Sequence, residues 1–183
     1  MRMRRKKHGS ERIAACAHLL IPLPESVLEN PGSYFPVDRP LHLEIGCGKG
    51  AFACGMAAQH PDVNFIAMER VSDVACLALE KAKSREEERP DNLRFLIGDA
   101  RGLTEMFPPK TFDCIYLNFS DPWPKSGYHK RRLTYRAFLE QYRLLLKDGG
   151  TLRFKTDNAD LFAFSLEEFA AANLTIEWQT DDQ

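Results

Sequence analysis

The stretch LHLEIGCGKG, residues 41–50, joins an apolar run to a glycine-rich turn. The run at residues 41–45 is typical of a buried strand, and three glycines follow it at alternate positions. Glycine lets the backbone turn tightly and approach a ligand closely. Residues 51–59 then have helical character and stop before a proline at position 61. This order predicts a strand, a turn and a helix, which is the first unit of a parallel sheet.

The same alternation continues along the chain. Apolar runs predict further strands at residues 63–68, 93–97, 112–119, 151–156 and 174–178. Helices are expected from Ser72, from Thr134 to Gly149-Gly150, and from Asp157 or Asn158. Alternating strands and helices favour an α/β fold with a Rossmann-like, doubly wound and mostly parallel sheet. Residues 41–183 are expected to form this domain, and residues 1–40, basic and rich in proline, an irregular arm.

Composition excludes several classes of protein. The chain has 183 residues, 44% of them hydrophobic, and a formal net charge of -1, so it carries no overall basic signal for nucleic acid. Positive charge is instead local, at residues 2–7 and 125–132. The five cysteines form no CxxC pair, which favours a reduced, cytoplasmic environment. No signal peptide or run of membrane-spanning length is found, so neither export nor membrane insertion is expected.

Acidic residues follow the first three predicted strands or close them. Glu44 lies just before the glycines, where it would repel a pyrophosphate but can pair with a cationic amino-acid group such as that of S-adenosylmethionine. Glu69 ends the second strand and can accept hydrogen bonds from ribose hydroxyls. Asp99 follows the third and can accept from an adenine amino group, or merely cap the turn after it. The glycine turn alone is equally compatible with a plain turn or a dinucleotide site. Together the three acids resemble those of class I S-adenosylmethionine-dependent methyltransferases.

A second polar stretch, NFSDPWPK, follows the fourth strand at residues 118–125, and HKRRL comes soon after at residues 129–133. An acid, a proline frame, an aromatic ring and several cations suit a guanine base and its phosphates. Each part also has an ordinary interpretation. Asp121 and Trp123 can form a proline-braced turn, the cations can be a solvated face, and Asp157 can cap a helix.

The glycine motif, the acids, the DPWPK loop and KTDN at residues 155–158 appear in the order typical of one family. In this the chain closely resembles the tRNA (guanine-N7-)-methyltransferases of the TrmB type. The resemblance runs from the basic arm to the last residues. It implies S-adenosylmethionine as cofactor, tRNA as partner, and methylation of a guanine in the tRNA variable loop.

The resemblance also implies a role for each matching residue. It assigns to the cofactor Glu44, Gly46, Gly48, Gly50, Glu69, Asp99, Ala100, Asn118 and Asp121. It assigns to the substrate Trp123, Lys125, Lys130, Arg131, Arg132 and Asp157, and it makes Asp121 the catalytic residue. Guanine N7 is a lone pair with no proton to remove, so we expect Asp121 or Asp157 to orient the base by accepting from N1–H and the exocyclic amine. No metal is expected.

Two departures from the family pattern affect these expectations. Ser126-Gly127-Tyr128 stands where the family often has further basic residues, so Tyr128 stacking is expected to replace some phosphate binding. The family's final segment, with its Thr-x-Tyr/Phe-Glu motif and last antiparallel strand, is expected to be missing after Gln183, which would leave Leu152 and Phe154 near a sheet edge. The alternatives are an amino-methyltransferase and a catalytically silent RNA-binding module. Both a monomer and a homodimer are compatible with the sequence.

Overall fold

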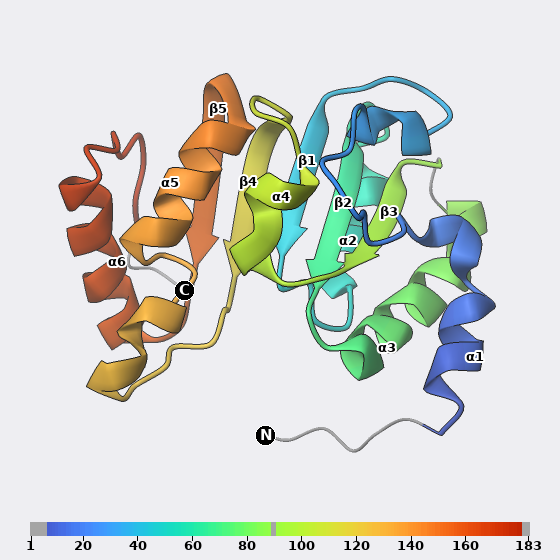
Figure 1. The fold of residues 1–183 in the computed structure, drawn as a ribbon, viewed down its shortest axis with the longest axis horizontal. Coiled ribbons are helices and arrows are strands. Elements are labelled where there is room, and N and C mark those ends of the chain that lie inside the picture. Colours follow the sequence, from blue (N-terminus) through green and yellow to red (C-terminus); the bar gives the residue numbers. More distant parts are fainter. Residues whose placement is uncertain (1–6, 89–90, 181–183) are drawn as a thin grey trace.

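In the computed structural model, which describes residues 7–88 and 91–180, five strands form one parallel sheet (Figure 1). The strands are β1 (Leu41–Ile45), β2 (Asn64–Glu69), β3 (Leu93–Ile97), β4 (Phe112–Asn118) and β5 (Leu146–Lys155). Their order is β3-β2-β1-β4-β5, and every pairing is parallel. The predicted α/β fold with a parallel sheet is confirmed. The chain reverses its direction of travel across the sheet at β1, where ligands of such sheets bind.

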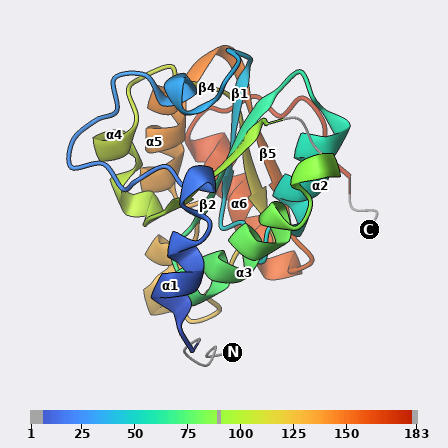
Figure 2. The same ribbon diagram turned by 90° about the vertical axis from the view of Figure 1, so that its right-hand side faces the viewer.

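Helices cover both faces of this sheet. They are α1 (Gly9–Ala14), α2 (Ala51–Gln59), α3 (Ser72–Lys83), α4 (Leu103–Met106), α5 (Arg136–Leu145) and α6 (Ala159–Ala171). Helices α4 and α5 pack on one face of the sheet, and α2 and α3 pack on the other (Figure 2). Two separate buried apolar clusters result, as the unbroken apolar character of the strands requires.

The junction of α5 and β5 differs from the prediction. Thr134 does not cap α5, because its hydroxyl is buried against that of Ser165 at 2.7 Å. The carboxylate of Glu168 accepts instead from the backbone N–H of Arg136 at 2.6 Å, so α6 supplies the cap. At the other end Gly149 and its neighbour do not terminate α5; they lie within β5, where the register against β4 is irregular.

The predicted sixth strand at residues 174–178 is wrong. Residues 174–180 form no helix or strand, and β5 is the outer strand of the sheet within the described part of the chain. Only Leu174 packs against the core from this stretch, whereas Ile176 and Trp178 are exposed. Leu152 and Phe154 lie on the outer strand as expected, half-buried against the core.

The segment before β1 is more ordered than the irregular arm that the sequence predicts. It contains α1 and short 3-10 turns at residues 17–19 and 31–34. The N–H of Ile21 donates to the carbonyl of Phe95 in β3 at 2.8 Å, and Arg12 donates two hydrogen bonds to Glu80 in α3. The segment therefore packs along the β3 side of the domain. The basic cluster at residues 2–6 lies outside the described residues.

Gly50, which precedes α2, has a steric requirement of its own. Its φ is +74°, and a Cβ atom there would lie 2.9 Å from the Cβ of Ala78 in α3. We predict that Gly50→Ala lowers the free energy of unfolding by about 1–3 kcal/mol through clash and backbone strain. Gly55→Ala, in the middle of α2 with nothing within 4 Å of the new Cβ, should be neutral or stabilising. Urea denaturation of both variants tests this, and equal stabilities would contradict it.

Candidate functional site

The glycine loop folds over the carboxyl end of β2. The backbone N–H groups of Gly46 and Cys47 both donate to the carbonyl of Met68, at 2.8 and 2.9 Å. Gly46 and Gly48 have φ values of +77° and +56°, and a Cβ at either position would meet nothing within 4 Å. These glycines thus serve the backbone conformation and leave open space beside it, which is the room that a ligand needs.

Glu44 is the most unusual group at this edge of the sheet. Glu44 is only 4% exposed, and one of its carboxylate oxygens accepts a hydrogen bond from the Asn118 side-chain amide at 3.3 Å. The other oxygen, Oε2, is buried without a hydrogen-bond partner among the described residues. Burial raises the pKa of Glu44 to about 7, and the Asn118 amide opposes this only in part. A buried acceptor without a donor is costly, so the position suits a cationic group of a ligand.

Glu69 connects the glycine loop to the start of α3. Its Oε2 accepts from the N–H of Gly48 at 3.0 Å, and its Oε1 accepts from the N–H of Val71 at 2.9 Å. Each carboxylate oxygen has a further lone pair. Glu69 can therefore hold the loop in place and still accept from a pair of hydroxyls.

Asp99 caps the turn that follows it, which was the second of the two roles predicted for this residue. Its Oδ1 accepts from the N–H of Arg101 at 2.9 Å, at the start of the 3-10 turn Ala100–Gly102. The Arg101 guanidinium also donates to both carboxylate oxygens and lowers the pKa of Asp99. Ala100 is buried directly after it. A cofactor role for these two residues stays a prediction.

Asn118 is the last residue of β4, and its contact with Glu44 in β1 lies next to the starts of the glycine loop and of the loop that carries Asp121. Phe119 and Trp123 both have positive φ values, +51° and +43°, which are unusual for side chains of this size. Asp121 lies between them and is exposed. Its carboxylate forms no hydrogen bond or ion pair with any residue that the structure describes. It is therefore available to an external donor.

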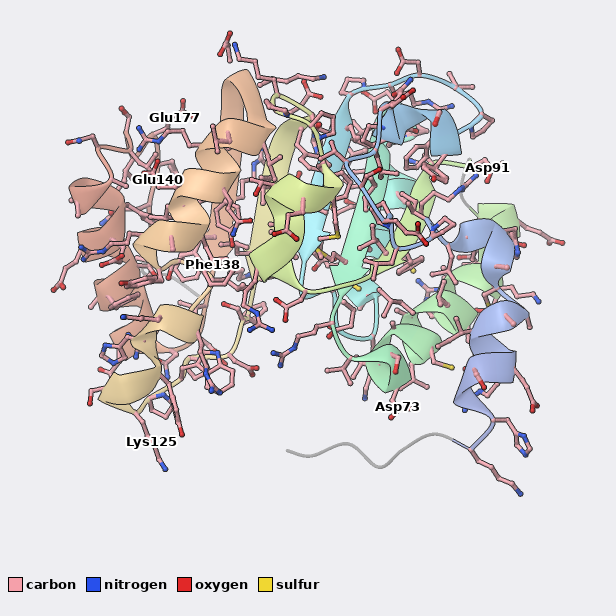
Figure 3. All side chains as sticks on the ribbon, viewed as in Figure 1. Asp73, Asp91, Lys125, Phe138, Glu140 and Glu177 are labelled. Carbon is pink, nitrogen blue, oxygen red and sulfur yellow. The ribbon has the colours of Figure 1, made fainter. Side chains whose placement is uncertain are left out.

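The predicted substrate cations divide into two groups. Lys125, Lys130 and Arg131 are exposed, and Figure 3 shows the Lys125 side chain extending away from the ribbon. The Arg131 guanidinium lies over two rings, 5.0 Å from that of Trp123 and 4.5 Å from that of Tyr128. These side chains form a cationic and aromatic surface.

Arg132 differs from the outward-facing position that the sequence suggests. The residue is 4% exposed, and its guanidinium donates to the carbonyls of Pro122 and Trp123 within its own loop. It also lies 4.4 Å from the ring centre of Phe164 in α6. The sequence gives no sign of this contact, because Phe164 is one of several apolar residues in the helix predicted from Asp157 or Asn158.

Asp157 precedes α6 and is exposed. The expected alternative was that it caps the helix, but Asn158 does this, since its Oδ1 accepts from the N–H of Leu161 at 2.8 Å. Within residues 7–88 and 91–180 the Asp157 side chain has no hydrogen-bond or ion-pair partner. Like Asp121, it is available to a ligand.

Comparison with known proteins decides the family. A family model described as "Putative methyltransferase" matches residues 38–183. The tRNA (guanine-N(7)-)-methyltransferase of Lactococcus lactis subsp. cremoris strain SK11 is 44% identical over 170 residues, covering 93% of this chain and 77% of the relative. That of Bacillus subtilis strain 168 is 41% identical over 182 residues, covering 100% of this chain and 84% of the relative. The chain belongs to the tRNA (guanine-N(7)-)-methyltransferase family.

Solved structures agree on the fold of this tRNA (guanine-N(7)-)-methyltransferase family member. TrmN from Thermus thermophilus matches with a TM-score of 0.52 and 24% identity, covering 86% of this chain and 40% of that one. A methyltransferase described as antibiotic related matches with a TM-score of 0.56 and 18% identity, covering 75% of this chain and 70% of that one. The chain thus shares its fold with these structures. No helix among the described residues is long and apolar enough to cross a membrane.

Burial of Glu44 makes the free energy of unfolding depend on pH. Because burial raises its pKa from 4.5 to about 7, ionisation of Glu44 favours unfolding, and its effect grows as pH rises from 4.5 to 7. We predict that Glu44→Gln stabilises the unliganded protein by up to about 3 kcal/mol at pH 8, and by little near pH 4.5. Denaturant titrations at both pH values measure this. A stability difference that does not change with pH would contradict it.

Proposed function

We propose that this chain transfers the methyl group of S-adenosylmethionine to N7 of guanine 46 in the variable loop of tRNA, giving 7-methylguanosine. The observation that carries the proposal is the hydrogen bond between Glu44 and Asn118. It joins a buried acid suited to a cationic ligand to the loop that presents Asp121, so a methyl donor and a base would lie side by side. The proposed reaction is the one named for the tRNA (guanine-N(7)-)-methyltransferases that this chain resembles. With tRNA as substrate, we also propose a cytoplasmic location.

Three acids would hold the cofactor. Glu44 would pair its free oxygen with the ammonium group of the methionine part, and Glu69 would accept from the ribose hydroxyls. Asp99, with Ala100 beside it, would face the adenine. S-Adenosylmethionine supplies an electrophilic methyl group on a sulfonium. The protein therefore has only to place a nucleophile in line with it.

Asp121 would orient the guanine and stabilise the charge that develops on it. N7 attacks as a neutral lone pair, so the ring becomes cationic while the sulfonium becomes a neutral thioether, and no proton leaves. A carboxylate that accepts from N1–H and the exocyclic amine binds this cation more strongly than the neutral base. Asp157, which also lacks a partner among the described residues, is the second residue placed to accept from the base.

The aromatic and cationic side chains of the loop would bind the surrounding RNA. Trp123 packs beside the base, and Lys125 reaches guanine O6 or a phosphate. Lys130 and Arg131, both exposed, would meet the backbone phosphates. Tyr128, which touches Arg131, adds a stacking surface.

The direct test uses a tRNA transcript and radiolabelled S-adenosylmethionine, followed by nucleoside analysis. We predict label in 7-methylguanosine, and none when guanine 46 is replaced by adenine. Label on an exocyclic nitrogen would identify an amino-methyltransferase instead. Binding of tRNA with no transfer of label would identify a silent RNA-binding module.

Asp121→Asn tests the orienting role. The amide replaces an acceptor oxygen by a donor, so it repels N1–H or the exocyclic amine, and we predict a fall in kcat of about 100-fold. Asp148→Asn is the matched control, because Asp148 is exposed at the opposite end of β5 and its ion-pair partner among the described residues is Lys110. Single-turnover rates measure both variants. Near-normal turnover of Asp121→Asn would refute this role.

A further inference from the structure

Arg132 is a buried cation for which the described residues provide no carboxylate partner. It is 4% exposed, yet none of the ion pairs that the structure describes includes it. Removing a guanidinium from water is costly unless its N–H groups find acceptors. The fold must therefore use this side chain for something that a solvated arginine cannot do.

Its acceptors are backbone carbonyls of the loop that carries Asp121. The Nε–H donates to the carbonyl of Pro122 at 2.8 Å, and Nη2–H donates to that of Trp123 at 3.3 Å. These two peptide groups directly follow Asp121. Trp123 has a φ of +43°, a strained conformation for a residue with a large side chain. The guanidinium thus holds a part of the loop, at Trp123, that backbone preferences alone do not favour.

The other face of Arg132 contacts α6. Its Cζ lies 4.4 Å from the ring centre of Phe164, and the His129 ring lies 5.5 Å from the same ring. Helix α6 begins directly after Asp157 and Asn158. A single side chain therefore joins the loop that presents Asp121 to the helix whose start presents Asp157.

From these contacts we infer that Arg132 is a positioning residue of the methyl-transfer site, an inference that rests on the proposed function. It fixes the Pro122 and Trp123 peptides, and so the direction of the Asp121 carboxylate, and it sets this carboxylate relative to Asp157. It does not bind RNA itself, unlike its exposed neighbours Lys130 and Arg131. Two acceptors in different directions require a planar group with several N–H donors, so lysine cannot replace it fully.

The test compares Arg132→Met and Arg132→Lys with the control Arg136→Met. Arg136 also joins this region to α6, through Glu168, but it is largely exposed, and its side-chain interactions within the described residues are with Glu168 and the Tyr135 ring. We expect kcat for tRNA methylation to fall roughly 10- to 100-fold in Arg132→Met, because a small misplacement of a reacting group costs about that much. Arg132→Lys should retain an intermediate rate, and Arg136→Met should stay within about twofold of the parent.

A second readout does not need the reaction. The chain has two tryptophans, Trp123 and Trp178, and Trp178 is 77% exposed. In a Trp178→Phe background the fluorescence therefore reports Trp123 alone. We expect Arg132→Met to increase acrylamide quenching and red-shift the emission, Arg132→Lys to do so less, and Arg136→Met to leave both unchanged.

The outcomes separate the two proposals. A changed Trp123 signal together with a reduced kcat at unchanged tRNA affinity supports the inference. An unchanged Trp123 signal, an unchanged kcat, or a loss confined to tRNA affinity overturns it, the last because it would make Arg132 a direct RNA contact. If Arg132→Met does not fold, Arg132→Lys decides by the same criteria. If the parent itself transfers no methyl group to tRNA, the proposed function fails, and the Trp123 signal alone then decides whether Arg132 holds the loop.

Discussion

The pairing of β1 with both β2 and β4 is the constraint on which the rest of the structure depends. Residues 41–45 lie in register with β2 on one side and with β4 on the other. The sheet therefore extends from β1 in two directions. The loops that follow β1 and β4 leave the sheet in different directions at the carboxyl ends of these strands. Glu44 and Asn118 meet there, one from each neighbouring strand. The site follows from the sheet order.

Local patterns predicted the first four strands of the sheet, but they placed the start of the fifth too late and added a sixth. The bounds of β1 and β3 agree with the prediction because each is an unbroken apolar run between clear stops. The stretch at residues 174–178 has the same kind of pattern but forms no strand, since an apolar run needs a paired neighbour as well as a pattern. The predicted end of α5 at Gly149 was too late. Gly149 lies in β5, where the pairing with β4 is irregular, and the sequence of α5 alone does not reveal that pairing.

The residues proposed for the site could be picked out from the sequence, but their contacts could not. The acids at the ends of the strands could be found because strand ends locate ligands in this fold. Their hydrogen-bond partners could not be predicted. Asn158, and not Asp157, caps α6, and the sequence does not distinguish two adjacent residues that can both cap a helix. Arg132 is the clearest case, because three consecutive basic residues look alike in sequence while only one of them turns inward. Whether such a cation faces water or carbonyl groups depends on how its own loop folds back and on the packing of α6 against it.

The free carboxylate of Asp121 has a consequence for the choice of base. A carboxylate without a partner in its own loop can only accept hydrogen bonds. If Asp121 contacts the base as proposed, guanine would offer it two adjacent N–H groups, whereas adenine would present the N1 lone pair, which repels the carboxylate and leaves it desolvated and unpaired. Under that proposal, selection between the two purines would rest on repulsion of the wrong one, and would need no side chain that reads N7 itself.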